Sequence, residues 1–257
     1  MLQPAASNER SPSASLSRAR LRALIAAAIA AVLPPTLFAI GVPGCGNDTV
    51  AQAAGGSSTT GGEAGVDHDG GPVVVTLYPD AAPLPGETTC KVVITTGITE
   101  TGFTHLPLCT PVAYGTNPPS GGDHWAYWAA YGKYTTPVPR QMYVHDEEHG
   151  GVVVAYRCES GCAELADGLG SVVDHAVDTY CAVTMAPPRY VLTPDPLLDT
   201  PIGVASWGST YTATCLDPKS LGDFMVASFG HGREMICGGG YDPAAIEATC
   251  ADAGDGG

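Results

Sequence analysis

The chain has little positive charge. Its 257 residues include only 11 Lys and Arg against 26 Asp and Glu, which gives a formal net charge of −15 with neutral histidines. A surface of this kind repels phosphate backbones, so we expect no nucleic-acid partner. It also repels anionic lipid headgroups, so we expect membrane contact through a lipid anchor alone.

The motifs of several enzyme classes are also absent. The sequence has no nucleophile elbow, no phosphate-binding glycine loop and no dinucleotide-binding fingerprint. The H-E-x-x-H motif of zincin proteases is not met, because Asp146 follows His145. In addition, Pro139 and Gly150 leave room for a helix of only about two turns. The sequence therefore identifies no reaction, and whether the chain is an enzyme stays open.

One uncharged apolar run lies near the N-terminus. It extends from Ala23 to Ile40 and follows Arg22, which is typical of a secretory signal. The run is just long enough for a membrane helix, but Pro34-Pro35 interrupts it. The next segment, Val42-Pro43-Gly44-Cys45, resembles the lipobox of bacterial lipoproteins, although its proline is unusual there. We therefore expect a lipoprotein, with ordinary secretion or a retained membrane helix as alternatives.

Composition divides the chain into a leader, a tether and one domain. We expect a signal peptide over residues 1–44, lipidation at Cys45, a disordered Gly/Ser-rich tether over 45–72, a folded domain over 73–250 and a flexible tail over 251–257. Cleavage before Cys45 would leave 7 basic and 25 acidic residues, so the mature chain is still more acidic. The expected location is extracytoplasmic, in the periplasm or at the cell surface.

The cysteine count agrees with an exported protein. The sequence has nine cysteines, and eight remain if Cys45 carries the lipid. An even number in an exported chain indicates disulfides, although eight cysteines allow 105 pairings. The candidates are Cys90, Cys109, Cys158, Cys162, Cys181, Cys215, Cys237 and Cys250.

Periodicity predicts a domain that mixes helices and strands. Short β-branched or apolar runs predict strands over residues 73–78, 91–96, 151–157, 190–193 and 202–207. Helical spacing predicts helices over 162–177 and 216–229, and Asp217-Pro218 is a suitable start for the second. We expect a single disulfide-stabilised domain of the α/β or α+β class, with a mixed β-sheet and two or more helices.

Histidines and carboxylates are concentrated in residues 121–125, 144–151 and 229–234, and His105 adds a fourth position. Imidazole is the commonest protein ligand of zinc, copper and iron. His145 and His149 are four residues apart, so they share one face of a helix. Glu148 can add an oxygen ligand or orient a histidine. A shared ion with bonds of about 2.1 Å requires ring nitrogens within about 3–4 Å of one another.

Structural interpretations stand beside these functional ones. Histidines can simply hydrogen-bond loop backbone, and we give His68, His175 and His231 little weight as ligands. The aromatic residues between Trp125 and Tyr134 can line a ligand pocket, but we favour packing of an irregular segment or a short helix.

Cys158 and Cys162 lie where a strand meets a helix, which suits a reactive dithiol. Their spacing and the six other cysteines favour a structural disulfide.

Several segments resemble domain-of-unknown-function family 3105 (DUF3105). The matching stretches are 117–124 (N-P-P-S-G-G-D-H), 144–153 (V-H-D-E-E-H-G-G-V-V), 190–194 (Y-V-L-T-P) and 204–208 (V-A-S-W-G). The resemblance covers roughly residues 100–235. Asp146-Glu147 stand where the family usually has Asn-Leu, and Arg233 stands where it has proline. The family has no established activity, so the resemblance implies a domain identity without a reaction.

The leading hypothesis is an exported domain that binds a transition metal, zinc or copper. Its expected ligands are His124, His145 and His149, with Glu148 and His105 as further ligands or as residues that orient them. The resemblance places all five at motif positions. The first alternative is a non-catalytic surface or interaction domain whose histidines are structural, and the second is a thiol-disulfide oxidoreductase. The sequence identifies no protein or small-molecule partner.

Overall fold

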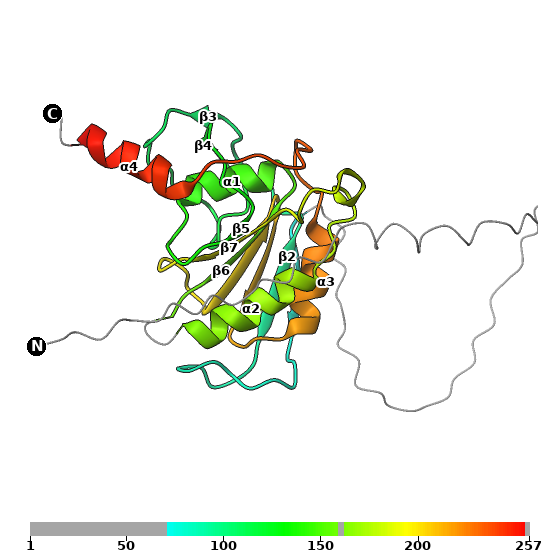
Figure 1. Cartoon of the computed structure of the whole chain (residues 1–257). Coiled ribbons are helices and arrows are strands. Elements are labelled where there is room, and N and C mark those ends of the chain that lie inside the picture. The colour runs from blue at the N-terminus through cyan, green and yellow to red at the C-terminus, as the bar shows by residue number, and fades with distance from the viewer. Residues whose placement is uncertain (1–70, 159–161, 255–257) are drawn as a thin grey trace, which may run out of the picture. The chain divides into compact units, whose positions relative to one another are not determined.

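The computed structural model describes residues 71–158 and 162–254 (Figure 1). The predicted signal peptide, Cys45, most of the predicted tether and His68 lie outside these residues. Within the described ranges, none of the helices is long and apolar enough to cross a membrane.

A seven-stranded mixed sheet forms the centre of the domain, as predicted. Its strands in spatial order are β1 (Val73–Leu77), β2 (Val92–Thr96), β9 (Ser209–Ala213), β8 (Ile202–Ser206), β6 (Val152–Tyr156), β7 (Tyr190–Pro194) and β5 (Gly132–Lys133). In this spatial order, each strand from β1 to β6 is antiparallel to the next one. Strand β7 is parallel to both of its neighbours, β6 and β5. A parallel pair needs a crossover connection, and the chain between β6 and β7 includes a helix that serves as one.

Four helices and a small second sheet complete the described fold. The helices are α1 (Arg140–Glu148), α2 (Ala163–His175), α3 (Pro218–Ser228) and α4 (Pro243–Gly254), and a 3-10 turn spans Ala182–Thr184. The second sheet pairs β3 (His105–Leu106) with β4 (His124–Trp125) in parallel. Both predicted helices, α2 and α3, are confirmed. The boundary between domain and tail expected at Cys250 falls inside α4.

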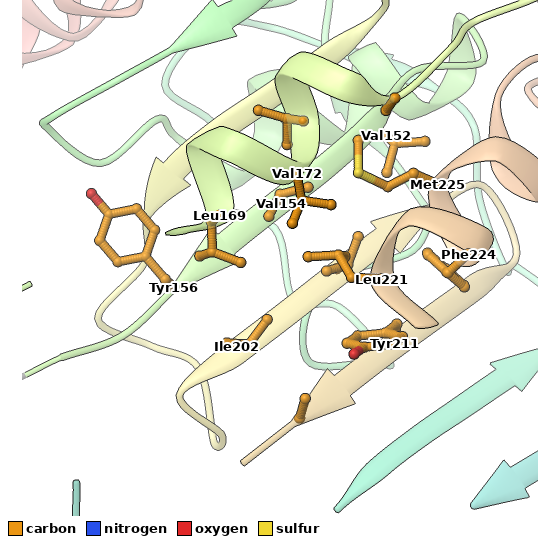
Figure 2. Close-up of a cluster of buried hydrophobic side chains, with 14 of the residues drawn as sticks. Val152, Val154, Tyr156, Leu169, Val172, Ile202, Tyr211, Leu221, Phe224 and Met225 are labelled. Atoms are coloured by element: carbon orange, nitrogen blue, oxygen red, sulfur yellow. The ribbon is translucent and has the colours of Figure 1, made fainter. Parts of the chain in front are cut away.

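Strand β6 packs against a different hydrophobic core on each face of the sheet. Val152, Val154 and Tyr156 belong to the cluster that packs under α2 and α3 (Figure 2), whereas Val153 and Ala155 belong to the cluster under α1. Successive side chains of a strand point to opposite faces, so a strand covered on both faces must be apolar throughout. This burial accounts for the continuous apolar run in the sequence.

Helices α2 and α3 close one face of the sheet. Leu169, Val172 and Val173 of α2 are buried at helical spacing, and Leu221 of α3 is fully buried beside them. Helix α3 begins at Asp217, whose carboxylate accepts a hydrogen bond from the Ser220 backbone N–H at 3.1 Å. This cap is the one that the sequence predicts, because it satisfies a donor that the first helical turn leaves free.

All eight predicted cysteines are paired. The disulfides are Cys90–Cys215, Cys109–Cys250, Cys158–Cys162 and Cys181–Cys237. Three of them join segments that are 56, 125 and 141 residues apart in the sequence. Disulfides persist in oxidising compartments, so this pattern indicates an extracytoplasmic location.

Candidate metal centre

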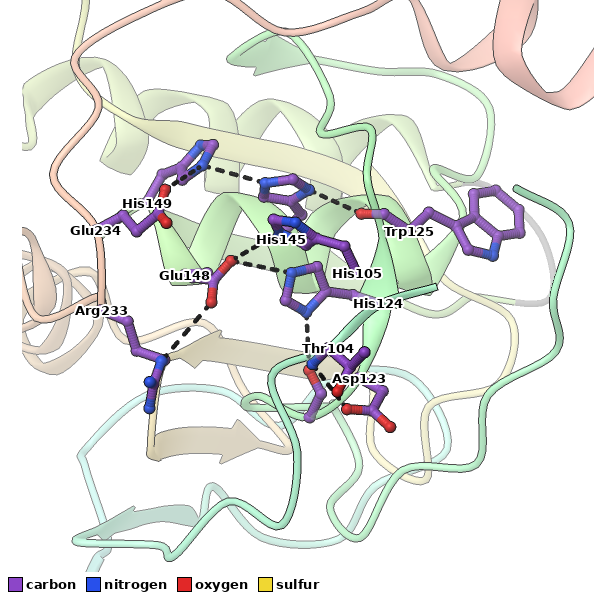
Figure 3. A network of polar contacts seen from close by, with 11 residues as sticks. Thr104, His105, Asp123, His124, Trp125, His145, Glu148, His149, Arg233 and Glu234 are labelled. Atoms are coloured by element: carbon purple, nitrogen blue, oxygen red, sulfur yellow. Dashed lines mark hydrogen bonds and ion pairs between the residues drawn. The ribbon is translucent and has the colours of Figure 1, made fainter. Parts of the chain in front are cut away.

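Helix α1 carries three side chains of the candidate centre on one face. His145, Glu148 and His149 are three and four residues apart, so they lie beside one another (Figure 3). The helix begins after Pro139 and ends where Gly150 adopts φ +78°, a conformation that glycine reaches without strain. This short helix of nine residues has the length that the flanking prolines and glycines predict.

The small sheet brings two more histidines to this helix. His105 and His124 are direct partners in the parallel register of β3 and β4, so their side chains are neighbours. Their ring centroids lie 4.9 Å apart, and each lies 4.5–4.7 Å from the ring of His145. Asp123 holds the starts of β3 and β4 together, because its carboxylate accepts a hydrogen bond from the Thr104 backbone N–H at 2.8 Å.

Four ligand atoms converge at the centre of this group. One nitrogen from each of three histidines and one Glu148 oxygen all lie within 4.8 Å of one another; the residues are His105, His124, His145 and Glu148. Glu148 Oε2 lies 3.1 Å from His105 Nε2 and 3.0 Å from His124 Nε2. These two distances fit a shared ion directly, and a pair at the limit of 4.8 Å would need to close by about 1.4 Å to reach the spacing of about 3.4 Å in a tetrahedral site.

Backbone carbonyls fix the protonation of two of the rings. His124 Nδ1 donates to the Gly122 carbonyl at 2.8 Å, and His145 Nδ1 donates to the Trp125 carbonyl at 2.7 Å. A carbonyl oxygen only accepts, so both Nδ1 atoms carry protons. In the neutral ring Nε2 then carries the lone pair; this atom lies 3.0 Å from Glu148 Oε2 in His124 and 3.1 Å from His149 Nε2 in His145. Histidines that bind metal ions are held in this way, by a hydrogen bond from the other ring nitrogen.

The surroundings keep the rings of His145 and His149 neutral and the Glu148 carboxylate charged. Burial, together with the neighbouring His149, lowers the pKa of His145 to about 3, and burial lowers the pKa of His149 to about 4. Burial also works against ionisation of Glu148, but the hydrogen bonds and charges of His124 and His105 outweigh it and lower its pKa. Neutral imidazoles and an ionised carboxylate are the forms that bind a metal ion.

His149 lies beside this group rather than within it. Its Nε2 is 3.1 Å from His145 Nε2 and 3.5 Å from Glu234 Oε2. Its ring packs edge-on against Trp128 with centroids 4.7 Å apart. The sequence places His149 among the first three ligands and His105 outside them, whereas the structure brings His105 into the four-residue group.

A buried arginine holds the end of helix α1 in place. Arg189 is fully buried and donates from Nε to Asp178 Oδ2 at 2.7 Å and from Nη2 to Asp178 Oδ1 at 3.1 Å. Its Nη1 donates to the His149 carbonyl at 2.7 Å, where the helix leaves carbonyls without partners. This ion pair therefore positions the ligand-bearing helix relative to β7. Sequence patterns alone give no indication of it.

The two other acidic residues of α1 point away from the candidate ligands. Asp146 and Glu147 are fully buried, and burial raises the pKa of both carboxyl groups well above the usual range. Asp146 Oδ2 accepts a hydrogen bond from the Ala129 backbone N–H at 3.1 Å. Neither residue belongs to the converging group.

Other sequence candidates lie apart from the centre. His175 is exposed on α2 and its Nδ1 donates to the Ser171 carbonyl, while His231 is exposed and lines a cavity of about 690 Å³ near Trp207. The segment from Trp125 to Tyr134 forms no helix, and between β4 and β5 it is irregular, which agrees with one of our two expectations. Trp125 is buried in the core under α1, and Trp128 contacts two histidines. The sequence marks Arg233 only as a departure from the family pattern and does not mark Phe103. Arg233 lies beside Glu148, and its guanidinium lies over the ring of Phe103.

Comparison with known proteins assigns the domain. A family model described as a protein of unknown function (DUF3105) matches residues 105–236, just over half of the chain. The chain belongs to this family. The matched DUF3105 region contains His105, His124, His145 and Glu148, together with Arg233. No curated protein and no solved structure gives a significant match to the chain.

Proposed function

We propose that this DUF3105 protein binds one divalent transition-metal ion, zinc or copper, through His105, His124, His145 and Glu148. The observation that carries the proposal is the convergence of three histidine nitrogens and a carboxylate oxygen within 4.8 Å. In two of the three rings, His124 and His145, a backbone carbonyl holds the other nitrogen. Three imidazoles and one carboxylate form a ligand set that suits zinc and copper better than calcium or magnesium.

The charges of the group support a cation at this place. Glu148 is 4% exposed and His124 is fully buried, so little water reaches the carboxylate. A divalent cation supplies the missing positive charge and accepts the free lone pairs of the rings.

The direct test is metal analysis of the full chain purified under non-reducing conditions. After incubation with zinc or copper and removal of excess metal, we expect about one ion per chain. The double variant His124→Ala/His145→Ala should retain much less. His175→Ala is the matched control, because it removes an exposed histidine on the far face of the sheet and should retain the wild-type stoichiometry.

The alternative of a non-catalytic domain with structural histidines gives the opposite result. In that case the wild type would hold no stoichiometric metal, and chelator would leave its melting temperature unchanged. The chelator experiment uses only the wild-type chain, so it remains decisive even if the double variant fails to fold.

We also propose that the protein is exported and anchored to a membrane by a lipid on Cys45. Two features support this: the lipobox-like Val42-Pro43-Gly44-Cys45, and an even number of remaining cysteines that are all paired. In a bacterial host, the full chain should enter the membrane fraction and incorporate a labelled fatty acid. Cys45→Ser should abolish the labelling. Equal labelling of both chains would contradict the anchor.

A further inference from the structure

The candidate centre is closed on one side and open on the other. His124, His145 and Glu148 are 0%, 2% and 4% exposed, whereas the His105 side chain is 44% exposed. The open side is therefore at His105. A small molecule that reached a bound ion would approach it from this side.

Arg233 borders the open side and is held in a defined orientation. Its guanidinium lies over the ring of Phe103, with Cζ 3.7 Å from the ring centroid. Its Nε is 3.7 Å from Glu148 Oε1 (Figure 3). Stacking on an aromatic ring fixes the plane of a guanidinium but uses none of its N–H donors.

The donors of Arg233 are largely free, in contrast to those of four other basic side chains among the described residues. Arg140, Arg189, Lys133 and Lys219 each lie within 2.6–2.8 Å of a carboxylate oxygen. Within the described residues, Arg233 Nη1 and Nη2 make no hydrogen bond, and the carboxylate oxygen beside this side chain, Glu148 Oε1, lies 3.7 Å from Nε. A guanidinium has five N–H donors, and these two nitrogens carry four of them.

The loop that carries Arg233 is fixed against helix α1. The Glu234 backbone N–H donates to the Glu148 carbonyl at 2.8 Å. A Cβ at Gly232 would lie 2.2 Å from that carbonyl oxygen, so only glycine permits this close approach. Cys237 is tied to Cys181 by a disulfide three residues beyond Glu234. The position of Arg233 beside Glu148 is therefore built into the fold.

We propose that Arg233 and the ion held by His105, His124, His145 and Glu148 form a binding site for a small carboxylate. This inference rests on the proposed metal function. One carboxylate oxygen would approach the ion beside His105 while the other accepts from the Nη atoms of Arg233. Planar carboxylates fit the fork of a guanidinium, and Arg233 acts here as a positioning residue for the ligand.

The local charge favours a singly charged ligand. A divalent ion and Arg233 contribute three positive charges, and Glu148 and Glu234 contribute two negative ones, which leaves one positive charge to balance. A carboxylate balances it, whereas a doubly charged phosphate would overcompensate close to Glu234, whose side chain is 51% exposed beside His149.

The test uses cobalt as a spectroscopic substitute in the full chain, with acetate as the probe. Cobalt stoichiometry is measured first, and acetate is then titrated at constant ionic strength while the visible absorption bands are recorded. We expect a saturable change of the bands in the wild type. We expect binding to be at least about tenfold weaker in Arg233→Met, to recover in part in Arg233→Lys, and to be stronger in Glu234→Gln.

Lys219→Met is the matched control, because it removes a positive charge that is 84% exposed on α3 and should leave acetate binding unchanged. Equal cobalt binding in all variants shows that Arg233→Met has kept the site. Full cobalt binding with an acetate response that is absent, or identical in Arg233→Met, would overturn this inference and leave the metal function intact. Tighter binding of inorganic phosphate than of acetate would overturn the assignment to carboxylates. Absence of binding of cobalt, zinc and copper alike would overturn both proposals.

Discussion

The two faces of the sheet are buried in different ways. Under α2 and α3 the buried side chains are almost all apolar, including Leu169, Val172, Leu221 and Met225. On the α1 side the buried residues include six ionisable ones: His124, His145, Asp146, Glu147, Glu148 and His149. Burying apolar surface stabilises a fold, whereas burying ionisable groups costs free energy unless partners compensate. The α1 side therefore carries a cost of burial that the side under α2 and α3 does not.

Among these predictions, Arg189→Met is expected to cause the largest loss of unfolding free energy, and it acts on the α1 side. The substitution leaves Asp178 buried without its partner and removes the donor to the His149 carbonyl. Breaking a buried ion pair in this way costs about 3–5 kcal/mol of unfolding free energy. Urea denaturation measures the loss. Arg157→Met is the control, because this exposed side chain only reaches the Asp199 carbonyl at 3.3 Å, and it should cost less than about 0.5 kcal/mol.

The same pair predicts part of the acid sensitivity of the protein. Burial works against ionisation of Asp178, but the hydrogen bonds and charge of Arg189 outweigh it, so the pKa of Asp178 is lowered. Its contribution to stability is therefore complete above the pKa of an unfolded Asp, about 3.9, and is lost as the pH falls through the lower folded value. Arg189→Met should flatten the stability profile below about pH 4. An unchanged profile would show that other groups dominate acid unfolding.

Leu221→Ala tests the apolar side by itself. Leu221 is fully buried between α3 and the sheet, and truncating a leucine of this kind costs about 3–5 kcal/mol through lost burial and the cavity that remains. We expect this loss in urea denaturation together with an unchanged metal stoichiometry. A fall in metal content would mean that the two sides of the sheet are coupled more closely than their separate cores indicate.

Much of the apolar side was predictable from local sequence. The run at 152–156 and the Asp217-Pro218 cap carry local patterns, and the structure confirms both. Helix α4 was not predicted, although Asp242-Pro243 repeats the same start: Asp242 Oδ1 accepts from the Ala244 backbone N–H at 3.1 Å. Strand β9 was also missed, because its Thr-rich sequence has few apolar residues to mark it.

The candidate centre was predictable only in part. The spacing of His145, Glu148 and His149 predicts a shared helical face, and the structure confirms that arrangement. The choice between His105 and His149 depends on the pairing of β3 with β4, which brings together segments 19 residues apart. The contact of Arg233 with Glu148 spans a still longer separation. Such contacts follow from the tertiary fold, and no local periodicity encodes them.

Metal binding should stabilise the α1 side without depending on the other side. With free metal at about 100 times the dissociation constant, a site present only in the folded state adds about 2.7 kcal/mol of unfolding free energy. Leu221→Ala should show the same increment as the wild type, because distant sites are additive to within about 0.5 kcal/mol. His145→Ala should show no increment. A smaller increment in Leu221→Ala than in the wild type would contradict this independence.

The smallest of these effects is expected from Cys158→Ser/Cys162→Ser. These cysteines pack against the apolar cluster of the α2 side and are only four residues apart, so their disulfide closes a short loop. The chain-entropy model then gives about 2 kcal/mol of unfolding free energy, and metal stoichiometry should not change.

The mutual pairing of Cys158 and Cys162 is also what a thiol-disulfide oxidoreductase would require, so the reduction potential of the pair decides that alternative. A structural disulfide resists glutathione buffers, with a potential below about −300 mV, whereas a value near −200 mV would assign this pair an exchange activity separate from the metal centre.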